Sequence, residues 1–240
     1  MGFCNSASYE RFWEGRKLWG ALVIESRSLT RQVMTLINDD SQDSAVKKQQ
    51  FVRMIVALCW ALNCQLRNKD PKDKLRDLLS EEHFKRIENK KFLPVILLSL
   101  MAEWINEQNR NKKMDTIILS SIDVQLNSIS QIIGGCERIA STPLPFAYSV
   151  LLHRTVYMYC FWLPFGLVDV VGWMMPVIVL FVSYTFIALD AIIQQIQDPF
   201  DEEENDLALN NLCETIQFSV YELADIAQPD FKTSNHYFID

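Results

Sequence analysis

The densest group of potential metal ligands in the sequence is a short acidic run near residue 200. Residues 201–206 read DEEEND, so five carboxylates and one amide fall within six positions. Such oxygen atoms are the hard ligands that Ca²⁺ prefers, and neighbouring carboxylates repel one another unless cations compensate them. The spacing is not that of an EF-hand, and no glycine lies inside the run. A solvated acidic loop before a helix explains the same residues, because a helix N-terminus favours negative charge.

Residues that commonly carry catalysis are sparse and scattered. His83, His153 and His236 lie in unrelated contexts, and no HExxH, GxSxG, P-loop or GxGxxG pattern is present. The 6 cysteines form no CxxC pair, which argues against zinc and thioredoxin-like chemistry. We therefore expect a protein that is not an enzyme, with reduced cysteines facing the cytosol.

Charge is distributed unevenly along the chain. Of the 23 lysines and arginines, 22 precede residue 155, together with 17 of the 30 acidic residues. The last 86 residues hold one cation and 13 acids, so the two parts carry +5 and −12 within the net charge of −7. The acidic balance argues against nucleic acid as a partner. Cationic segments of membrane proteins stay in the cytoplasm, so this sorting is typical of a membrane protein.

Two apolar stretches follow the basic part. Residues 170–189 contain no charge over twenty positions. A helix of that length spans roughly 30 Å, the hydrocarbon thickness of a bilayer, although a buried core helix is the alternative. Residues 144–168 form the second stretch, which His153 and Arg154 interrupt. Charges at that depth face a protein interior or snorkel to the membrane boundary, and the sequence leaves both possibilities open.

The two stretches predict a transmembrane helical hairpin over residues 144–196. The link, expected around residues 166–169, carries no Lys or Arg, so the positive-inside rule places both hairpin ends in the cytoplasm. Pro176 is expected to kink the second helix. The predicted location is therefore the cell membrane, crossed more than once, with membrane lipid as a partner and most of the chain cytoplasmic.

The other segments predict a helical cytoplasmic body, without strand patterns or internal repeats. Apolar residues recur at helical spacing in four segments, residues 5–37, 45–66, 115–133 and 205–227. The apolar run at 93–108 is shorter than a full membrane span, so we expect a core helix there. Gly134 and Gly135 indicate a helix break or close packing.

The predicted fold class is all-α, a helical membrane protein of one domain over residues 1–240. Residues 1–143 form mainly cytoplasmic helices, residues 144–196 form the hairpin, and residues 197–240 hold the acidic run, a helix and a tail.

Three segments carry a more specific pattern. They are residues 137–155 (ERIASTPLPFAYSVLLHRT), residues 2–20 (GFCNSASYERFWEGRKLWG) and residues 198–209 (DPFDEEENDLAL). In this order they resemble parts of the bestrophin family, and specifically its prokaryotic branch. The resemblance implies a subunit of a homopentameric channel that passes small inorganic ions, chloride or monovalent cations, with five subunits around one central pore.

The resemblance also implies pore residues. The family narrows its pore at a neck of three apolar side chains on the second membrane helix, and only the last maps here, onto Phe3. A cytoplasmic constriction maps onto Ile117, with Ile118 as its neighbour. A ring of such side chains gates by dewetting. Packing in a helix core is the competing interpretation for both isoleucines.

The acidic run aligns with the Ca²⁺ clasp of animal bestrophins. The aligned residues are Glu202, Glu203, Asn205 and Asp206. However, Asp201 replaces a glycine found before the clasp, and the residues that follow resemble prokaryotic members. We therefore expect no tight Ca²⁺ site and no cofactor.

The chain begins in mid-helix, without a capping residue, where the family has a first membrane helix and most of a second. We expect a longer chain cut short at its start. The alternative to a channel subunit is therefore a non-conducting membrane scaffold or interaction protein. The sequence leaves anion or cation selectivity open, although an acidic C-terminal third would favour cations.

Overall fold

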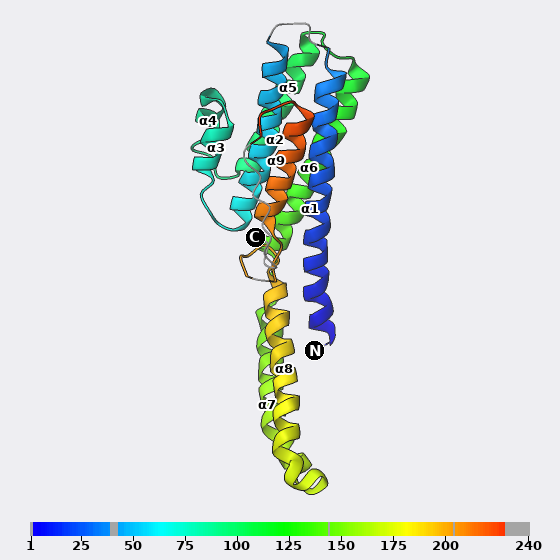
Figure 1. The fold of residues 1–240 in the computed structure, drawn as a ribbon, viewed down its shortest axis with the longest axis vertical. Helices are drawn as coiled ribbons and strands as arrows, with labels where there is room; N and C mark the ends of the chain where they lie inside the picture. The colour runs from blue at the N-terminus through cyan, green and yellow to red at the C-terminus, as the bar shows by residue number, and fades with distance from the viewer. Residues whose placement is uncertain (1, 39–42, 144, 204, 229–240) are drawn as a thin grey trace.

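The computed structural model describes residues 2–38, 43–143, 145–203 and 205–228, with the side chains of residues 2–5, 146, 148 and 149 excepted. Within these ranges every regular element is a helix, which confirms the predicted all-α class. A long helical hairpin projects from one end of a helical body (Figure 1). The amino-terminal end of the first helix reaches the level of the hairpin.

Five longer helices form the body. They are α1 (Gly2–Leu36), α2 (Ser44–Leu66), α5 (Leu93–Arg110), α6 (Thr116–Ser141) and α9 (Leu209–Leu223). Helix α2 is apolar on almost all sides and is buried from Phe51 to Asn63 except at Arg53, because α5 and α9 both pack against it. The other helices bury one stripe each, as their helical spacing of apolar residues predicts. Helix α5, expected as a core helix, packs against α2 and α6 through one buried stripe, and its other side is exposed, as at Val95.

Helix α1 runs antiparallel to α6 along most of its length. Gln32 Nε2 donates to Ser121 Oγ at 3.3 Å near one end, and Arg138 pairs with Glu14 near the other. Between these contacts Gly135 faces Leu18, where an added Cβ would lie 2.9 Å from Leu18 Cδ1. Gly135 therefore allows close packing, whereas Gly134 has nothing within 4 Å of an added Cβ, and α6 continues through both glycines without the alternative helix break.

A short arm made of α3 (Lys72–Leu78) and α4 (Glu81–Ile87) covers one flank of α2. Ser80 caps α4, since its hydroxyl accepts a hydrogen bond from the backbone N–H of His83 at 3.4 Å. Lys74 Nζ lies 3.3 Å from the centre of the Trp60 ring, which attaches the arm to α2.

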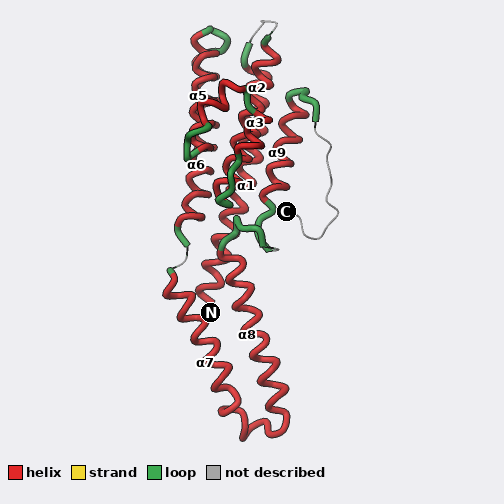
Figure 2. Tube along the Cα trace, turned by 90° about the vertical axis from the view of Figure 1, so that its left-hand side faces the viewer, coloured by secondary structure: helices red, strands yellow, loops and turns green. Residues whose placement is uncertain are grey.

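The hairpin consists of α7 (Phe146–Val171), a short 3₁₀ turn, η1 (Gly172–Met174), and α8 (Met175–Gln197), and its two helices lie side by side (Figure 2). The expected link at 166–169 is wrong, because α7 continues through Pro164 to Val171. The chain turns at Gly172, whose φ of 57° suits a residue without Cβ. The expected kink at Pro176 is also wrong. Pro176 lies in the first turn of α8, where backbone N–H groups have no hydrogen-bond partner within the helix, so its missing N–H costs no helical hydrogen bond.

The hairpin is long and apolar enough to cross a membrane. The qualifying segment runs from Val150 to Gln197, and none of its most apolar window is buried by the rest of the chain. Large side chains such as Phe165, Trp173 and Phe181 are more than half exposed. This surface fits a hydrocarbon environment and would be costly in water.

Candidate functional site

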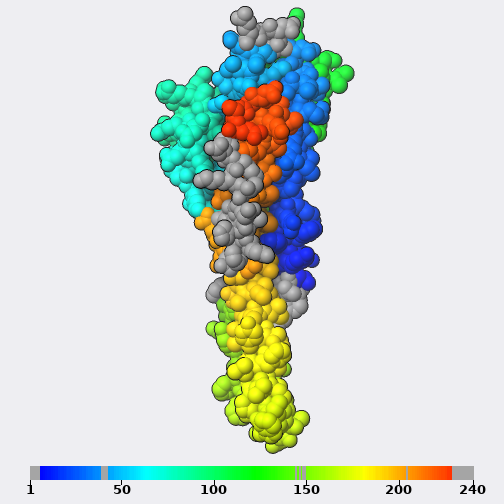
Figure 3. Space-filling view, viewed as in Figure 1, coloured from blue at the N-terminus to red at the C-terminus, as the bar shows by residue number. Residues whose placement is uncertain are grey.

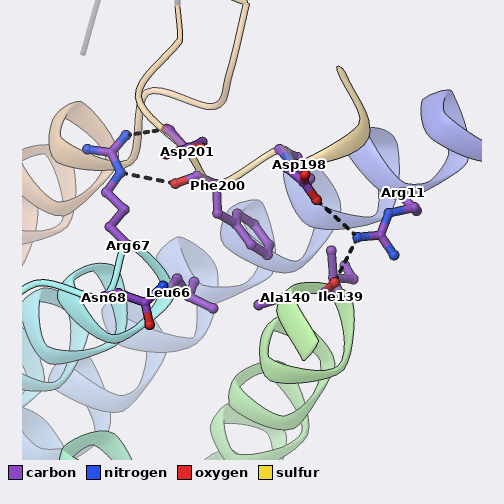
Figure 4. A pocket seen from close by; sticks show the side chains of 10 residues that line it. Arg11, Leu66, Arg67, Asn68, Ile139, Ala140, Asp198, Phe200 and Asp201 are labelled. Carbon is purple, nitrogen blue, oxygen red and sulfur yellow. Dashed lines mark hydrogen bonds and ion pairs between the residues drawn. The ribbon is translucent and has the colours of Figure 1, made fainter. Parts of the chain in front are cut away.

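The acidic run lies in an irregular segment that joins the hairpin to the last body helix. We call residues 198–207, between α8 and α9, the acidic strap. The strap crosses the ends of α2 and α6 and the side of α1, and two arginines lie beside it (Figure 4). The strap is therefore the place where the hairpin and the body are joined.

Arg67, the residue that ends α2, holds the strap mainly through backbone carbonyl groups. Its Nε donates to the Phe200 carbonyl at 3.2 Å, and Nη2 donates to the carbonyls of Asp201 at 3.2 Å and Leu207 at 3.4 Å. Nη1 also pairs with a carboxylate oxygen of Glu202 at 3.3 Å. The Arg67 side chain is only 3% exposed. One buried guanidinium therefore donates hydrogen bonds to several carbonyl groups of an irregular segment, which regular secondary structure would otherwise have to pair.

Arg11, on α1, ties the ends of two other helices together. Its Nη2 donates to the Ile139 carbonyl at 2.8 Å, Nη1 donates to the Thr142 carbonyl, and Nε donates to the Gln197 carbonyl at 3.1 Å. Its guanidinium also lies 3.7 Å from a carboxylate oxygen of Asp198. Because cations stabilise helix C-termini, Arg11 fixes the ends of α6 and α8 against α1.

Phe200 packs between these arginines. An added Cβ at Gly15 of α1 would lie 3.1 Å from ring carbon Cε1 of Phe200 and 3.4 Å from Leu207. Phe200 is 5% exposed and belongs to the apolar core of the body. A hollow of about 180 Å³ remains beside the ring, lined by Arg11, Arg67 and the backbone of the strap.

The predicted clasp residues have different partners. Glu202 pairs with Lys69 and Arg67, and Asn205 Nδ2 donates to Gln195 Oε1 at 2.7 Å. Asp206 Oδ2 accepts the backbone N–H of Glu203 at 2.8 Å, and Asp206 Oδ1 is buried without a partner in the described part of the chain.

A second hollow, of about 360 Å³, lies on the α8 side of the strap and is lined by acidic residues. The lining carboxylates are those of Asp198, Asp201, Glu203 and Asp206. Burial raises the pKa of Asp206 to about 6, and the nearby charges of Asp201 and Glu203 add to the rise, against the hydrogen bond from the Glu203 backbone.

The residues present do not fit a bound Ca²⁺ ion. Arg67 already occupies carbonyl oxygens of the strap, and Lys69 and Arg67 neutralise Glu202. Among the described residues, no three of the acidic side chains converge closely enough to coordinate one ion.

The predicted pore residues lie at opposite ends of the body. Phe3 is in the first turn of α1, and its side chain lies outside the described part of the structure. Ile117 is in the first turn of α6 and is 76% exposed, whereas Ile118 is partly buried and packs against the core. Within one subunit, therefore, Ile118 packs against the core and Ile117 does not, and the pore role of both residues stays a prediction.

A polar contact also joins the two hairpin helices. His153 Nδ1 on α7 hydrogen-bonds to Asp190 Oδ2 on α8, and Gln194 Nε2 lies 2.7 Å from His153 Nε2. Asp190 is 8% exposed. From the sequence, His153 and Arg154 could face either a protein interior or the membrane boundary. In the structure, His153 faces the other helix of the hairpin. Asp190 was not identified from the sequence as the partner of His153. Their positions could have indicated it, because His153 is as far from the start of α7 as Asp190 is from the end of α8.

Residues 1–222 match the family of bacterial and fungal bestrophin proteins. The chain belongs to the bestrophin family. This bestrophin is 46% identical over 223 residues to a voltage-dependent anion channel-forming protein of Ralstonia nicotianae, which covers 93% of this chain and 72% of that protein. It is 40% identical over 228 residues to another of that name from Escherichia coli, over 95% and 73% of the two chains.

The fold of this bestrophin is also found in solved structures. A crystal structure of a bacterial bestrophin homolog from Klebsiella pneumoniae matches 95% of this chain and 83% of that one, with 38% identity and a TM-score of 0.88. The bestrophin family is one of membrane ion channels and not of enzymes.

Proposed function

We propose that this bestrophin is a subunit of an anion channel in the cell membrane, assembled from five copies of the chain around one pore. The proposal is supported by family membership and by relatives named as voltage-dependent anion channel-forming proteins. The ions that would pass are small and inorganic, with chloride as the first candidate.

The observation that carries the proposal is the exposed hairpin. Its most apolar window has no buried residue within the chain, so lipid or neighbouring membrane helices must cover it. The hairpin crosses the membrane twice, and the body, which holds 21 of the 23 lysines and arginines before its start, lies in the cytoplasm.

Ile117 suits a constriction at the cytoplasmic end of the pore. This large aliphatic side chain is 76% exposed, so the described part of its own subunit leaves most of it uncovered. Five such side chains around an axis would form an apolar ring, which stops ions by expelling water when it is narrow. Ile118 serves packing instead, and Phe3 would line the neck at the other end of the same pore.

The acidic strap couples the membrane hairpin to the body. Arg11 binds the last carbonyl of α8, and Arg67 binds the strap that follows it. A displacement of α8 in the membrane would therefore be transmitted to α1 and α2.

The test is reconstitution of the purified chain. Native mass spectrometry in detergent should give a pentamer, and vesicles should pass a current whose reversal potential in a KCl gradient follows chloride. A monomer without current would contradict the proposal. A pentamer without current would support the non-conducting membrane scaffold instead, and a reversal potential that follows potassium would refute anion selectivity.

A further inference from the structure

The solvent-facing side of α1 carries a row of cations. Arg16, Lys17, Arg27 and Arg31 are all exposed, and they lie along sixteen residues, or roughly 22 Å of helix. Figure 3 shows the surface of α1, in blue, along one edge of the body down to the level of the hairpin. We call these four residues the basic row.

The basic row has few partners of opposite charge. Arg27 Nε donates to Ser219 Oγ at 3.0 Å, and the Arg16 guanidinium lies 5.8 Å from the centre of the Trp13 ring. Lys17 and Arg31 contact no acidic side chain within the described ranges of the chain. Their charges therefore point into solvent, where they create a positive field.

Acidic residues near the basic row do not cancel it. On α1, Glu14 is paired with Arg138, and Glu25 is half-buried with its pKa raised by burial. On α6, the neighbouring helix, Asp123 is the one charged residue from position 116 to position 136, and it accepts a hydrogen bond from Asn127. Glu10 is the exposed acid of α1 and precedes the row.

Spacing places part of the basic row on the same side of α1 as the proposed neck residue. Counting in sevens from Phe3 leads to Glu10, Lys17, Ile24 and Arg31. Seven residues make almost two full turns, with a drift of about 20° per step, so these positions stay on one side of a straight helix. Between the two cations, Ile24 is 64% exposed, so this side of α1 is not covered within the subunit.

We infer that the basic row, and Lys17 and Arg31 in particular, lines the cytoplasmic approach to the pore, where it concentrates small inorganic anions and sets the preference for anions over cations. The inference rests on the proposed channel function and names the residues that determine its selectivity. Cations lining an aqueous passage raise the local anion concentration and lower that of cations, because protein walls focus the field. Acidic residues of the C-terminal third lie in the strap and in α9, which packs against α1 and contacts Arg27 at Ser219, but Lys17 and Arg31 have no acidic partner in the described part of the chain.

A cysteine placed within the basic row measures its field without any current. In a chain whose Cys4, Cys64 and Cys160 are replaced by serine, Ile24→Cys is treated with a sulfonate and a trimethylammonium methanethiosulfonate. We expect the anionic reagent to be favoured about fivefold or more, relative to free cysteine. Adding Lys17→Gln and Arg31→Gln should remove most of that preference.

The matched control is Leu223→Cys on α9, which is 48% exposed and lies between Glu222 and Asp225. This cysteine should react preferentially with the cationic reagent. The two glutamine substitutions should leave its preference between the reagents unchanged. A thiol at position 24 that reacts with neither reagent in the assembled protein would overturn the inference, because a neighbouring copy would then cover the row. An unchanged ratio after the glutamine substitutions would overturn it as well.

Current measurements separate this inference from the proposed function. Lys17→Glu with Arg31→Glu should shift the reversal potential in a KCl gradient toward potassium. Lys90→Glu with Lys91→Glu, an equal charge change in the exposed loop before α5, should not. If the unsubstituted chain conducts and the two pairs behave alike, the inference fails and the channel function stands. If the unsubstituted chain passes no current, the function itself is contradicted.

Discussion

Phe200 of the acidic strap lies against the backbone of α1 at Gly15. A Cβ atom at Gly15 would approach ring carbon Cε1 of Phe200 within 3.1 Å, closer than most van der Waals contacts. The strap directly follows the membrane hairpin in sequence. Through this contact, the segment that leaves the hairpin packs against α1, the helix that also carries Phe3. The absence of a side chain at one residue therefore sets how closely the two parts of the molecule approach.

Alanine substitutions should reveal that contact. Gly20→Ala, on the same helix with nothing within 4 Å, should stabilise the protein by up to about 1 kcal/mol through helix propensity. Gly15→Ala gains the same propensity but must push Phe200 aside, so its gain should be smaller or absent. Thermal unfolding in detergent measures the difference. Equal increases in Tm would show that the strap yields freely at Gly15.

Removal of Arg67 should loosen the strap. Arg67→Leu removes the donor to the partly buried carbonyl of Phe200 and to the exposed carbonyl of Asp201, and we expect a loss of about 2 kcal/mol. Limited proteolysis should then cut within residues 198–207 faster than in the unsubstituted chain. Arg110→Leu, at the exposed end of α5, serves as the control and should leave the cutting rate unchanged. Equal protection of the strap in both variants would contradict the role of Arg67.

Stability should depend on pH through Asp206. Its folded-state pKa, about 6, is raised above the usual value of 3.8, so the folded state favours the protonated form. The resulting stability is complete below about pH 3.8 and is lost as the pH rises through 6. Asp206→Asn should flatten this part of the Tm profile and raise Tm at pH 8. Asp123→Asn is the surface control, and identical profiles for both variants would argue against this titration.

Ile117 and Ile118 should separate pore and packing roles. Ile117→Ser makes the proposed ring wettable, so single-channel current should increase while Tm changes little. Ile118→Ser removes a contact with the core and should cost about 1 kcal/mol or more, with a lower Tm. The opposite pattern, a lower Tm for Ile117→Ser with an unchanged current, would show that Ile117 contributes to packing and not to the pore.

Helix positions followed from periodicity where a body helix buries one stripe, and from the long apolar run for α2, which is buried on almost all sides. The ends of the hairpin followed from the sequence too, but its turn did not. The charged residue Asp169 suggested a boundary, but α7 continues past it to Val171, and the break depends on a positive φ at Gly172. Pro176 suggested a kink, because a proline that starts a helix and one that bends it look alike in sequence.

The site was only partly predictable for a similar reason. The acidic strap was found from its own residues, and the expectation of no tight calcium site rested on a replaced glycine and on the resemblance of the following residues to prokaryotic members. The cations that hold the strap could not be found this way. Arg67 lies 133 residues from Phe200, and Arg11 lies 186 residues from Gln197, and nothing in the local sequence distinguishes these arginines from exposed ones. Tertiary packing alone selects them.

Helix α1 is a single uninterrupted rod of 35 residues, about 50 Å long. Arg11 anchors it near one end, and its far end touches the loop before α6, where Asn38 N–H donates to the Lys113 carbonyl at 2.8 Å. A rod pivoting at such an anchor acts as a lever. A tilt of roughly 5° at the membrane moves the tip by about 3 Å over the 25 residues between them. Small motions beside the bilayer would thus be magnified next to Ile117, more than 30 Å away by the same helical rise.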